Sequence, residues 1–297
     1  MKRFAAIALL LTCLLPTCAL AQETVVENFE DGYWFYEDPS QDVRIEITRH
    51  EDAENRILWY EADLRCGPET PLAFLTVDPN APGKGFWYPE RMARENQAVF
   101  AINDDQFGHR VYNHDTVGVI VRGGEVLSER TRKSGSGSWP PLDTAAFMTD
   151  GSMRVFQSAE HTGQEYLDMG AEAVLAFGPW LVREGQINPV LEASYRAKEP
   201  RTAIGMIEPY HYIVLFVEGR VKRSGGVGVK WLADRMAELG AVEALNLDGG
   251  KTSCLVFMGK KISITNPNGL VRDGRSVSGM IGLGVSDLVP EWTGLDK

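Results

Sequence analysis

The pattern of apolar and polar positions predicts many short strands and few helices. Residues 98–102 form an apolar run that is too short for a helix and is bounded by polar residues, which fits a buried strand. Asp-Gly lies between the apolar runs 145–148 and 153–157, and this dipeptide favours a tight hairpin turn. Residues 201–207 and 212–217 have the pattern of an antiparallel pair. The strands are therefore expected to occur mainly as hairpins.

Three segments have the pattern of a helix: residues 89–97, 164–171 and 229–239. In residues 229–239 the apolar side chains recur at helical spacing, and Gly240 follows as a C-cap. Residues 89–97 begin with a proline, which is favoured in the first turn. Because strands outnumber helices, we expect an α+β fold with a mixed, largely antiparallel sheet core and a few packed helices. Residues 133–141, KSGSGSWPP, are the best candidate for a linker or flexible loop.

The N-terminus has the features of a secretory signal peptide. Lys2 and Arg3 precede an apolar stretch, and Ala19-Leu20-Ala21 is a small-x-small cleavage site. We expect cleavage after Ala21 and an exported protein, periplasmic or secreted, without a membrane anchor, because residues 1–21 are too short for a comfortable membrane span.

Charge and cysteine content exclude several classes of partner. Without residues 1–21 the chain has 28 Lys and Arg against 41 Asp and Glu, a net charge of −13. This balance argues against nucleic acid or an anionic membrane as a partner, although a few local arginines could still hold an anionic substrate. Cys66 and Cys254 are then the remaining cysteines, and they could form one disulfide or stay as buried free thiols.

The segment ALNLDGGKTS, residues 244–253, carries the strongest chemical signal. An apolar run ends in Asp248, and two glycines follow, which allow positive φ and a close approach to the backbone. A tight turn in which Asp248 holds its own backbone is the alternative interpretation. The segment is not a phosphate-binding loop of the nucleotide-binding type, because Leu245 occupies the position where the pattern requires its first glycine. The five histidines show no zinc-binding pair.

Carboxylates and cations gather at the predicted strand ends. Two carboxylates in different environments can divide the roles of acid and base in cleaving a glycosidic bond, and arginines with glycine-rich amides can bind phosphate. Arg201 and Glu218 could instead form a simple ion pair between neighbouring strands. The candidates for these roles are Asp104, Asp105, Glu218, Asp248, Asn103, Asn246, Arg201, Arg220, Lys251 and Arg275.

Five motifs, read together and in order, resemble the phosphodiester glycosidase family. They are NDDQF (103–107), FGPWLVREGQI (177–187), PRTAIGM (200–206), VEGR (217–220) and LGAVEALNLDGG (239–250). The resemblance spans about residues 55–287 and implies a family domain over residues 55–297, with residues 22–54 as an N-terminal extension. It also implies an exported hydrolase, since bacterial members are usually exported and often related to exopolysaccharides.

The chain departs from the family pattern at several positions. Lys251 intrudes after the LDGG motif, where the family usually continues with glycine. In the first motif Asp104 and Gln106 replace a glycine and an aromatic residue, and Glu218 replaces an aspartate. The later motif is recognisable as Asn266-Pro267 and Asp273-Gly274-Arg275.

The resemblance and the residue chemistry predict a hydrolase that cleaves a sugar-1-phosphodiester or a related envelope or extracellular glycan linkage. Asp248, with Asp104 or Asp105 and with Glu218, would act at the anomeric centre. The predicted substrate-binding residues are Asn103, Arg201, Thr202, Arg220, Asn246, Gly249, Gly250, Lys251, Thr252 and Arg275.

Two alternatives and several properties stay open at this point. The same fold could serve a non-catalytic polysaccharide-binding or envelope-assembly protein. No cofactor or metal is expected. Asp104, Asp105 and Asp248 could bind calcium, but their spacing in the sequence matches no calcium loop. The sugar, the aglycone and the oligomeric state stay open.

Overall fold

The computed structural model describes residues 22–107, 118–130, 142–191, 197–264 and 275–294. The predicted signal peptide, the predicted loop at 133–141, and Asn266, Pro267, Asp273 and Gly274 lie outside these residues.

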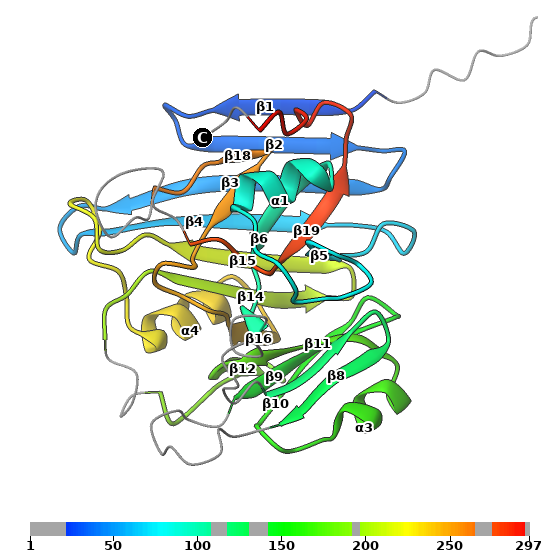
Figure 1. Cartoon of the computed structure of the whole chain (residues 1–297). Helices are drawn as coiled ribbons and strands as arrows, with labels where there is room; N and C mark the ends of the chain where they lie inside the picture. Colours follow the sequence, from blue (N-terminus) through cyan, green and yellow to red (C-terminus); the bar gives the residue numbers. More distant parts are fainter. Residues whose placement is uncertain (1–21, 108–117, 131–141, 192–196, 265–274, 295–297) are drawn as a thin grey trace, which may run out of the picture.

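The largest element of the fold is a nine-stranded sheet, whose strands are stacked from β1 at the top of Figure 1 downward. Each neighbouring pair of its strands is antiparallel. In spatial order the strands are β1 (Thr24–Asn28), β2 (Tyr33–Asp38), β3 (Val43–Asp52), β4 (Ile57–Arg65), β15 (His211–Val217), β14 (Arg201–Glu208), β16 (Glu243–Asn246), β12 (Trp180–Arg183) and β13 (Gln186–Ile187).

Two five-stranded antiparallel sheets complete the strand framework. The β6 sheet contains, in spatial order, β18 (Lys260–Lys261), β17 (Leu255–Phe257), β6 (Ala98–Asn103), β19 (Gly279–Val285) and β5 (Ala73–Thr76). The β11 sheet contains β10 (Met153–Phe156), β9 (Asp143–Met148), β11 (Ala171–Phe177), β7 (Gly118–Arg122) and β8 (Glu125–Arg130). The described residues include the helices α1 (Pro89–Glu95), α3 (Gly163–Asp168) and α4 (Val229–Glu238). The predicted α+β class with a largely antiparallel core is confirmed.

One continuous core joins the three sheets. It combines side chains of the nine-stranded sheet, such as Ile45 and Phe216, with Phe100 of β6 and Leu175 of β11. The opposite face of the nine-stranded sheet is covered in part by α4, which buries Leu232 and its neighbours against β12 to β16. Central β6 is buried along its whole length. The polar residues that follow β6 are therefore held at the meeting point of the sheets.

The aromatic and acidic segment near the N-terminus forms strands of the main sheet. Trp34, Tyr36 and Asp38 of β2 face the core, while the residues between them are partly exposed. The pleat explains this alternation, because successive side chains of a strand point to opposite faces. The predicted boundary between residues 54 and 55 falls in the β3–β4 hairpin, and the sheet is continuous across it.

The cysteine alternatives are resolved by the structure. Cys66 and Cys254 are both free and buried. Burial raises the pKa of the Cys254 thiol to about 12, so this thiol is un-ionised at neutral pH. No helix in the described part of the chain is both long and apolar enough to cross a membrane.

Candidate active site

Asn103, the last residue of β6, connects three parts of the fold. Its Nδ2 donates to the backbone oxygens of Asp248 (2.7 Å) and Asp104 (3.1 Å). Its Oδ1 accepts from Thr202 Oγ1 (2.8 Å) and from the Cys254 amide (3.1 Å). Both Asn103 and Thr202 are fully buried. The two residues thus hold the loop after β16 against β6 and β14, and their polar groups are already used within the protein.

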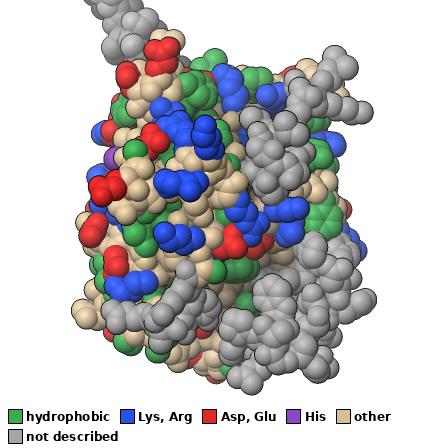
Figure 2. Space-filling model, turned by 90° about the vertical axis from the view of Figure 1, so that its left-hand side faces the viewer, with side chains coloured by type: hydrophobic (Ala, Val, Ile, Leu, Met, Phe, Trp, Pro, Cys, Tyr) green, Lys and Arg blue, Asp and Glu red, His purple; other side chains and the backbone are tan. Residues whose placement is uncertain are grey.

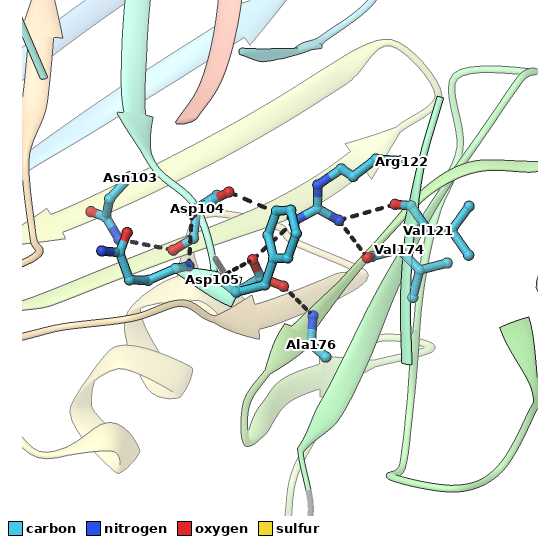
Figure 3. A network of polar contacts seen from close by, with 9 residues as sticks. Asn103, Asp104, Asp105, Val121, Arg122, Val174 and Ala176 are labelled. Atoms are coloured by element: carbon cyan, nitrogen blue, oxygen red, sulfur yellow. Dashed lines mark hydrogen bonds and ion pairs between the residues drawn. The ribbon is translucent and has the colours of Figure 1, made fainter. Parts of the chain in front are cut away.

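Asp105 ties the end of β6 to the β11 sheet (Figure 3). One carboxylate oxygen accepts from Arg122 Nη2 at 2.9 Å, and the other accepts from the Ala176 amide at 2.7 Å. Arg122 also donates to the carbonyl oxygens of Val121 and Val174. A fully buried carboxylate with both oxygens bonded is suited to hold structure. This geometry weighs against the acid or base role that we predicted for Asp105.

Asp104 lies beside the same arginine and is also buried. Its Oδ1 accepts from the Gln106 amide at 2.7 Å, and its Oδ2 lies 3.7 Å from Arg122 Nη2. Gly279 of β19 faces this carboxylate, and a Cβ at Gly279 would lie 2.4 Å from Asp104 Oδ2. The carboxylate therefore occupies the space that a side chain at Gly279 would need.

The loop after β16 needs both of its glycines. Gly249 packs so closely on Pro200 that a Cβ would lie 2.8 Å from the Pro200 carbonyl oxygen. Gly250 has φ +65° and donates its amide to the same oxygen at 3.0 Å. Asp248 is half-buried, and its Oδ1 accepts from the Gly249 amide at 2.9 Å. The close approach of the two segments places Asp248 next to the beginning of β14.

Four cationic residues lie in this loop or beside it. A Cβ at Gly250 would lie 3.4 Å from Arg220 Nη2, and one at Gly249 would lie 3.9 Å from Arg201 Cδ. The Arg275 amide donates to the Lys251 carbonyl at 3.3 Å. Figure 2 views the side of the molecule that carries the β15–α4 connection, on the left in Figure 1, and shows Lys and Arg side chains gathered across it. We call Arg201, Arg220, Lys251 and Arg275 the cationic rim.

Arg201 is the most buried cation of the rim. Its guanidinium donates to the carbonyl oxygens of Val227 (3.4 Å) and Ala197 (3.1 Å), and among the described residues it makes no ion pair with a carboxylate. Burial lowers its pKa, while nearby Glu199 acts in the opposite direction. Arg220 bonds Glu199 instead, at 2.6 Å. A desolvated cation that bonds carbonyls is available to an anionic ligand.

Three other predicted residues serve the framework around the loop. The Thr252 hydroxyl is buried and accepts from Arg275 Nη1 at 3.3 Å. Asn246 is buried, and its Nδ2 donates to the Gly178 carbonyl at 2.8 Å. Glu218 is fully buried and accepts from the Ile264 amide at 2.6 Å. The acid or base role of Glu218 stays a prediction.

Several buried polar atoms near the end of β6 have no partner in the described part of the chain. They are Gln106 Oε1, Ser253 Oγ, Ser278 Oγ and Asn246 Oδ1. Ser278 immediately precedes β19 and Ser253 stands two residues before β17, and these two strands flank β6. Because buried polar groups are normally hydrogen-bonded, these atoms mark the end of β6 as a place where water or a ligand supplies the missing partners.

Two residues of the site escaped the sequence analysis. Arg122 ends an apolar run, and a single buried arginine in such a run is the weak signal that could have found it. Gly279 opens the closing strand, and nothing local distinguishes it from the other glycines of that strand. Within the described residues, no group of three or more His, Cys, Asp or Glu side chains is placed to hold a metal ion.

The fold and the site define a strand-rich α+β domain with a strand-end carboxylate beside a cationic rim. The chain belongs to the phosphodiester glycosidase family, since the family model matches residues 96–284. The uncharacterized protein YomE, derived from the SPbeta prophage of Bacillus subtilis (strain 168), is 28% identical over 175 residues, which are 58% of this chain and 26% of YomE. The chain thus spans about a quarter of the length of that curated relative.

Two solved structures share the fold. The catalytic domain of zebrafish N-acetylglucosamine-1-phosphodiester alpha-N-acetylglucosaminidase, auto-inhibited by its pro-peptide, has a TM-score of 0.64 and 17% identity and covers 84% of this chain and 86% of that one. A hypothetical protein from Synechocystis has a TM-score of 0.51 and 15% identity, with 82% of this chain and 62% of that chain covered. Family membership supports a glycosidase-type function.

Proposed function

We propose that this protein is an exported hydrolase that cleaves a sugar-1-phosphodiester linkage at the Asp248 loop. The observation that carries the proposal is the cationic rim around a half-buried carboxylate in a chain whose net charge is −11. A phosphodiester is an anion that joins a sugar to a second group. A site for it needs cations for the phosphate and a carboxylate for the glycosidic bond.

Each part of the site can be given a role in that reaction. Arg201 and Lys251 would bind the phosphate oxygens, with Arg220 and Arg275 at the edge of the rim. Asp248 would act as acid or base at the anomeric centre, and Asp104 is the candidate for the second carboxylate. Asp105 and Arg122 would hold Asp104 in position without touching the substrate. The signal peptide would export the protein to the compartment of its glycan substrate.

The direct test compares Asp248→Asn with the parent protein on a synthetic N-acetylglucosamine-1-phosphodiester, with release of the reducing sugar as the readout. We expect kcat/KM to fall by about 10²- to 10⁴-fold, the usual contribution of a general acid or base. Asp31→Asn, an exposed carboxylate that accepts from Asn28 Nδ2 at 2.7 Å, is the matched control and should keep full activity.

Two results would overturn the proposal. Full activity of Asp248→Asn would remove Asp248 from the chemistry. Glycan binding without turnover in the parent protein, unchanged in Asp248→Asn, would instead favour a non-catalytic polysaccharide-binding or envelope-assembly protein.

A further inference from the structure

A pocket of about 320 Å³ is lined by residues of β3, β4 and α4, on the face of the nine-stranded sheet that α4 covers. Figure 1 shows the position of α4 beside the sheet. The volume of the pocket is at the lower end of the range of small-molecule sites, about 300–1,000 Å³. We call it the indole pocket. It is lined by Asp52, Ile57, Trp59, Trp231, Asp234, Arg235 and Glu238.

The walls of the indole pocket follow from the periodicity of a strand and a helix. In β4, Leu58 and Tyr60 point into the core, so Ile57 and Trp59 point outward. On α4 the lining residues are spaced by three and four positions and share one face, while Leu232 and Met236 pack on the sheet. The pocket is therefore the corner between the sheet surface and the side of the helix.

The two indole rings that form the corner are held firmly. Their centroids lie 5.6 Å apart at an interplanar angle of 77°, and His50 stacks on Trp59 at 5.2 Å. Glu61 joins the two walls, since its Oε1 accepts from Trp59 Nε1 at 2.6 Å and from Arg235 Nε at 2.7 Å. Both rings are only partly buried. The corner thus presents ordered aromatic surface to solvent. A ligand that stacks on it would bind with little loss of side-chain entropy, because the two rings are already held in place.

Polar groups beside the rings have hydrogen-bonding capacity left. Asp234 uses Oδ1 for Lys230, and Glu238 uses Oε2 for Arg235. Within the described residues, Asp234 Oδ2, Glu238 Oε1 and Arg235 Nη2 make no hydrogen bond. Acceptors and a donor therefore stand next to apolar ring surface, which matches the hydroxyl groups and C–H faces of a sugar ring.

The charge of the pocket determines whether it can bind a phosphate group or an uncharged sugar ring of a glycan. Three carboxylates and one guanidinium line it, so it repels phosphate. The cationic rim has the opposite character. The two sites lie on connected segments, because Arg56 of the β3–β4 hairpin donates to the Lys222 carbonyl and Arg223 pairs with Glu51. Both contacts join that hairpin to the β15–α4 connection that also carries Arg220.

We propose that the indole pocket is a second, non-catalytic carbohydrate site that binds an uncharged or amino-bearing sugar unit. It stacks the sugar on Trp59 and Trp231 and bonds its hydroxyl groups through Asp234, Arg235 and Glu238. This assignment does not depend on the proposed phosphodiester chemistry. If both hold, the pocket binds a sugar unit of a longer glycan while the rim holds a phosphodiester.

The test titrates the purified protein with glucose, galactose, glucosamine, N-acetylglucosamine and chitotriose, followed by tryptophan fluorescence and saturation-transfer NMR. We expect saturable binding of at least one sugar, weakened about five- to tenfold by Trp231→Ala through loss of ring stacking. Asp234→Asn, which hardly changes the volume, should weaken the same sugar. Tyr88→Ala removes an aromatic side chain that is 54% exposed elsewhere on the surface and should leave binding unchanged.

The outcomes separate this site from the candidate active site. Asp248→Asn should retain sugar binding at the indole pocket, and inorganic phosphate should not compete for it. The proposal is overturned if no sugar of the panel binds, or if binding survives both Trp231→Ala and Asp234→Asn. Binding of tetramethylammonium without binding of any sugar would also overturn it, because the pocket would then be an ammonium site.

Discussion

Gly279 and Asp104 show how one missing side chain positions a carboxylate at the candidate site. A Cβ at Gly279 would lie 2.4 Å from Asp104 Oδ2, which no real contact allows. The Gln106 amide donates to one oxygen of the Asp104 carboxylate, and Arg122 Nη2 lies 3.7 Å from the other. An added methyl group would therefore push the carboxylate away from its place at the end of β6.

Gly279→Ala is accordingly expected to lower activity more than stability. A misplacement of about 1 Å can cost about 10² in rate, whereas overpacking costs about 1–3 kcal/mol in the free energy of unfolding. The measurements are kcat/KM on the phosphodiester substrate and urea denaturation. Gly282→Ala on the same strand is the control, because its Cβ would meet the flexible end of Leu75 at 2.9 Å, far from Asp104. Equal loss of activity in both variants would show that Gly279 has no special relation to Asp104.

The sequence predicts some of these residues better than others for a physical reason. Asp248 and its two glycines stand next to one another in the sequence, so they form a local pattern. The backbone requires a glycine there, because Gly250 has φ +65°. Asp104 and Asp105 are equivalent in the sequence. Their difference comes from Arg122, 17 residues from Asp105, and from an amide of the β11 sheet 71 residues away. Such partners are set by tertiary packing, so no local pattern separates the two carboxylates.

At the scale of elements, β6 and α4 can be predicted from local sequence pattern, whereas β1 and β2 depend on tertiary packing. The periodicity of α4 and the apolar run of β6 predict them to within a few residues. The first two strands carry many acidic and aromatic residues, which hides the alternation of Trp34 and Tyr36 that the pleat requires. Their pairing with β3 is a property of the assembled sheet.

The seam between the β11 sheet and the nine-stranded sheet contains two carboxylates with opposite electrostatics. Glu243 of β16 accepts from the Val155 amide at 2.8 Å, and burial raises its pKa. Glu160, after β10, accepts two bonds from Arg183 at 3.0 and 2.8 Å, and this arginine lowers the pKa of Glu160. The seam should therefore respond to pH in two directions.

The matched variants Glu160→Gln and Glu243→Gln test this expectation. The folded pKa of Glu160 lies below its ordinary 4.5, so its stabilisation is present above pH 4.5 and is lost as the pH falls through the folded pKa. The folded pKa of Glu243 lies above 4.5, so its contribution decreases as the pH rises from 4.5 through the folded pKa. Urea denaturation of both variants and the parent between about pH 3 and pH 7 measures these differences.

The free energy of unfolding of the parent minus that of each variant should thus change with pH in opposite directions for Glu160→Gln and Glu243→Gln. The advantage of the parent over Glu160→Gln should be at most about 1 kcal/mol and should vanish in acid. The advantage over Glu243→Gln should be largest in acid. Parallel slopes for the two variants would contradict the assigned electrostatics of the seam.

At the scale of the whole molecule, one face carries the charge opposite to the net charge of the chain. The chain has a formal net charge of −11, yet Lys and Arg side chains gather on the face shown in Figure 2. Such a local field would favour the anionic substrate that we propose. The indole pocket differs from this face, because carboxylates outnumber cations in its lining.

Lys251 provides the last test, because it is an exposed member of the rim and directly follows Gly250 in the loop. Added salt screens exposed charges over about 8 Å at physiological ionic strength, so KM for a phosphodiester should rise with salt while kcat changes little. Lys251→Met should raise KM at low salt and flatten this dependence, because one screened charge is gone. Lys84→Met, an exposed lysine before α1, is the control and should keep the parent's salt dependence. If Lys251→Met instead lowers kcat with KM unchanged, Lys251 acts in the transition state of the reaction, and its role is chemical rather than one of substrate capture.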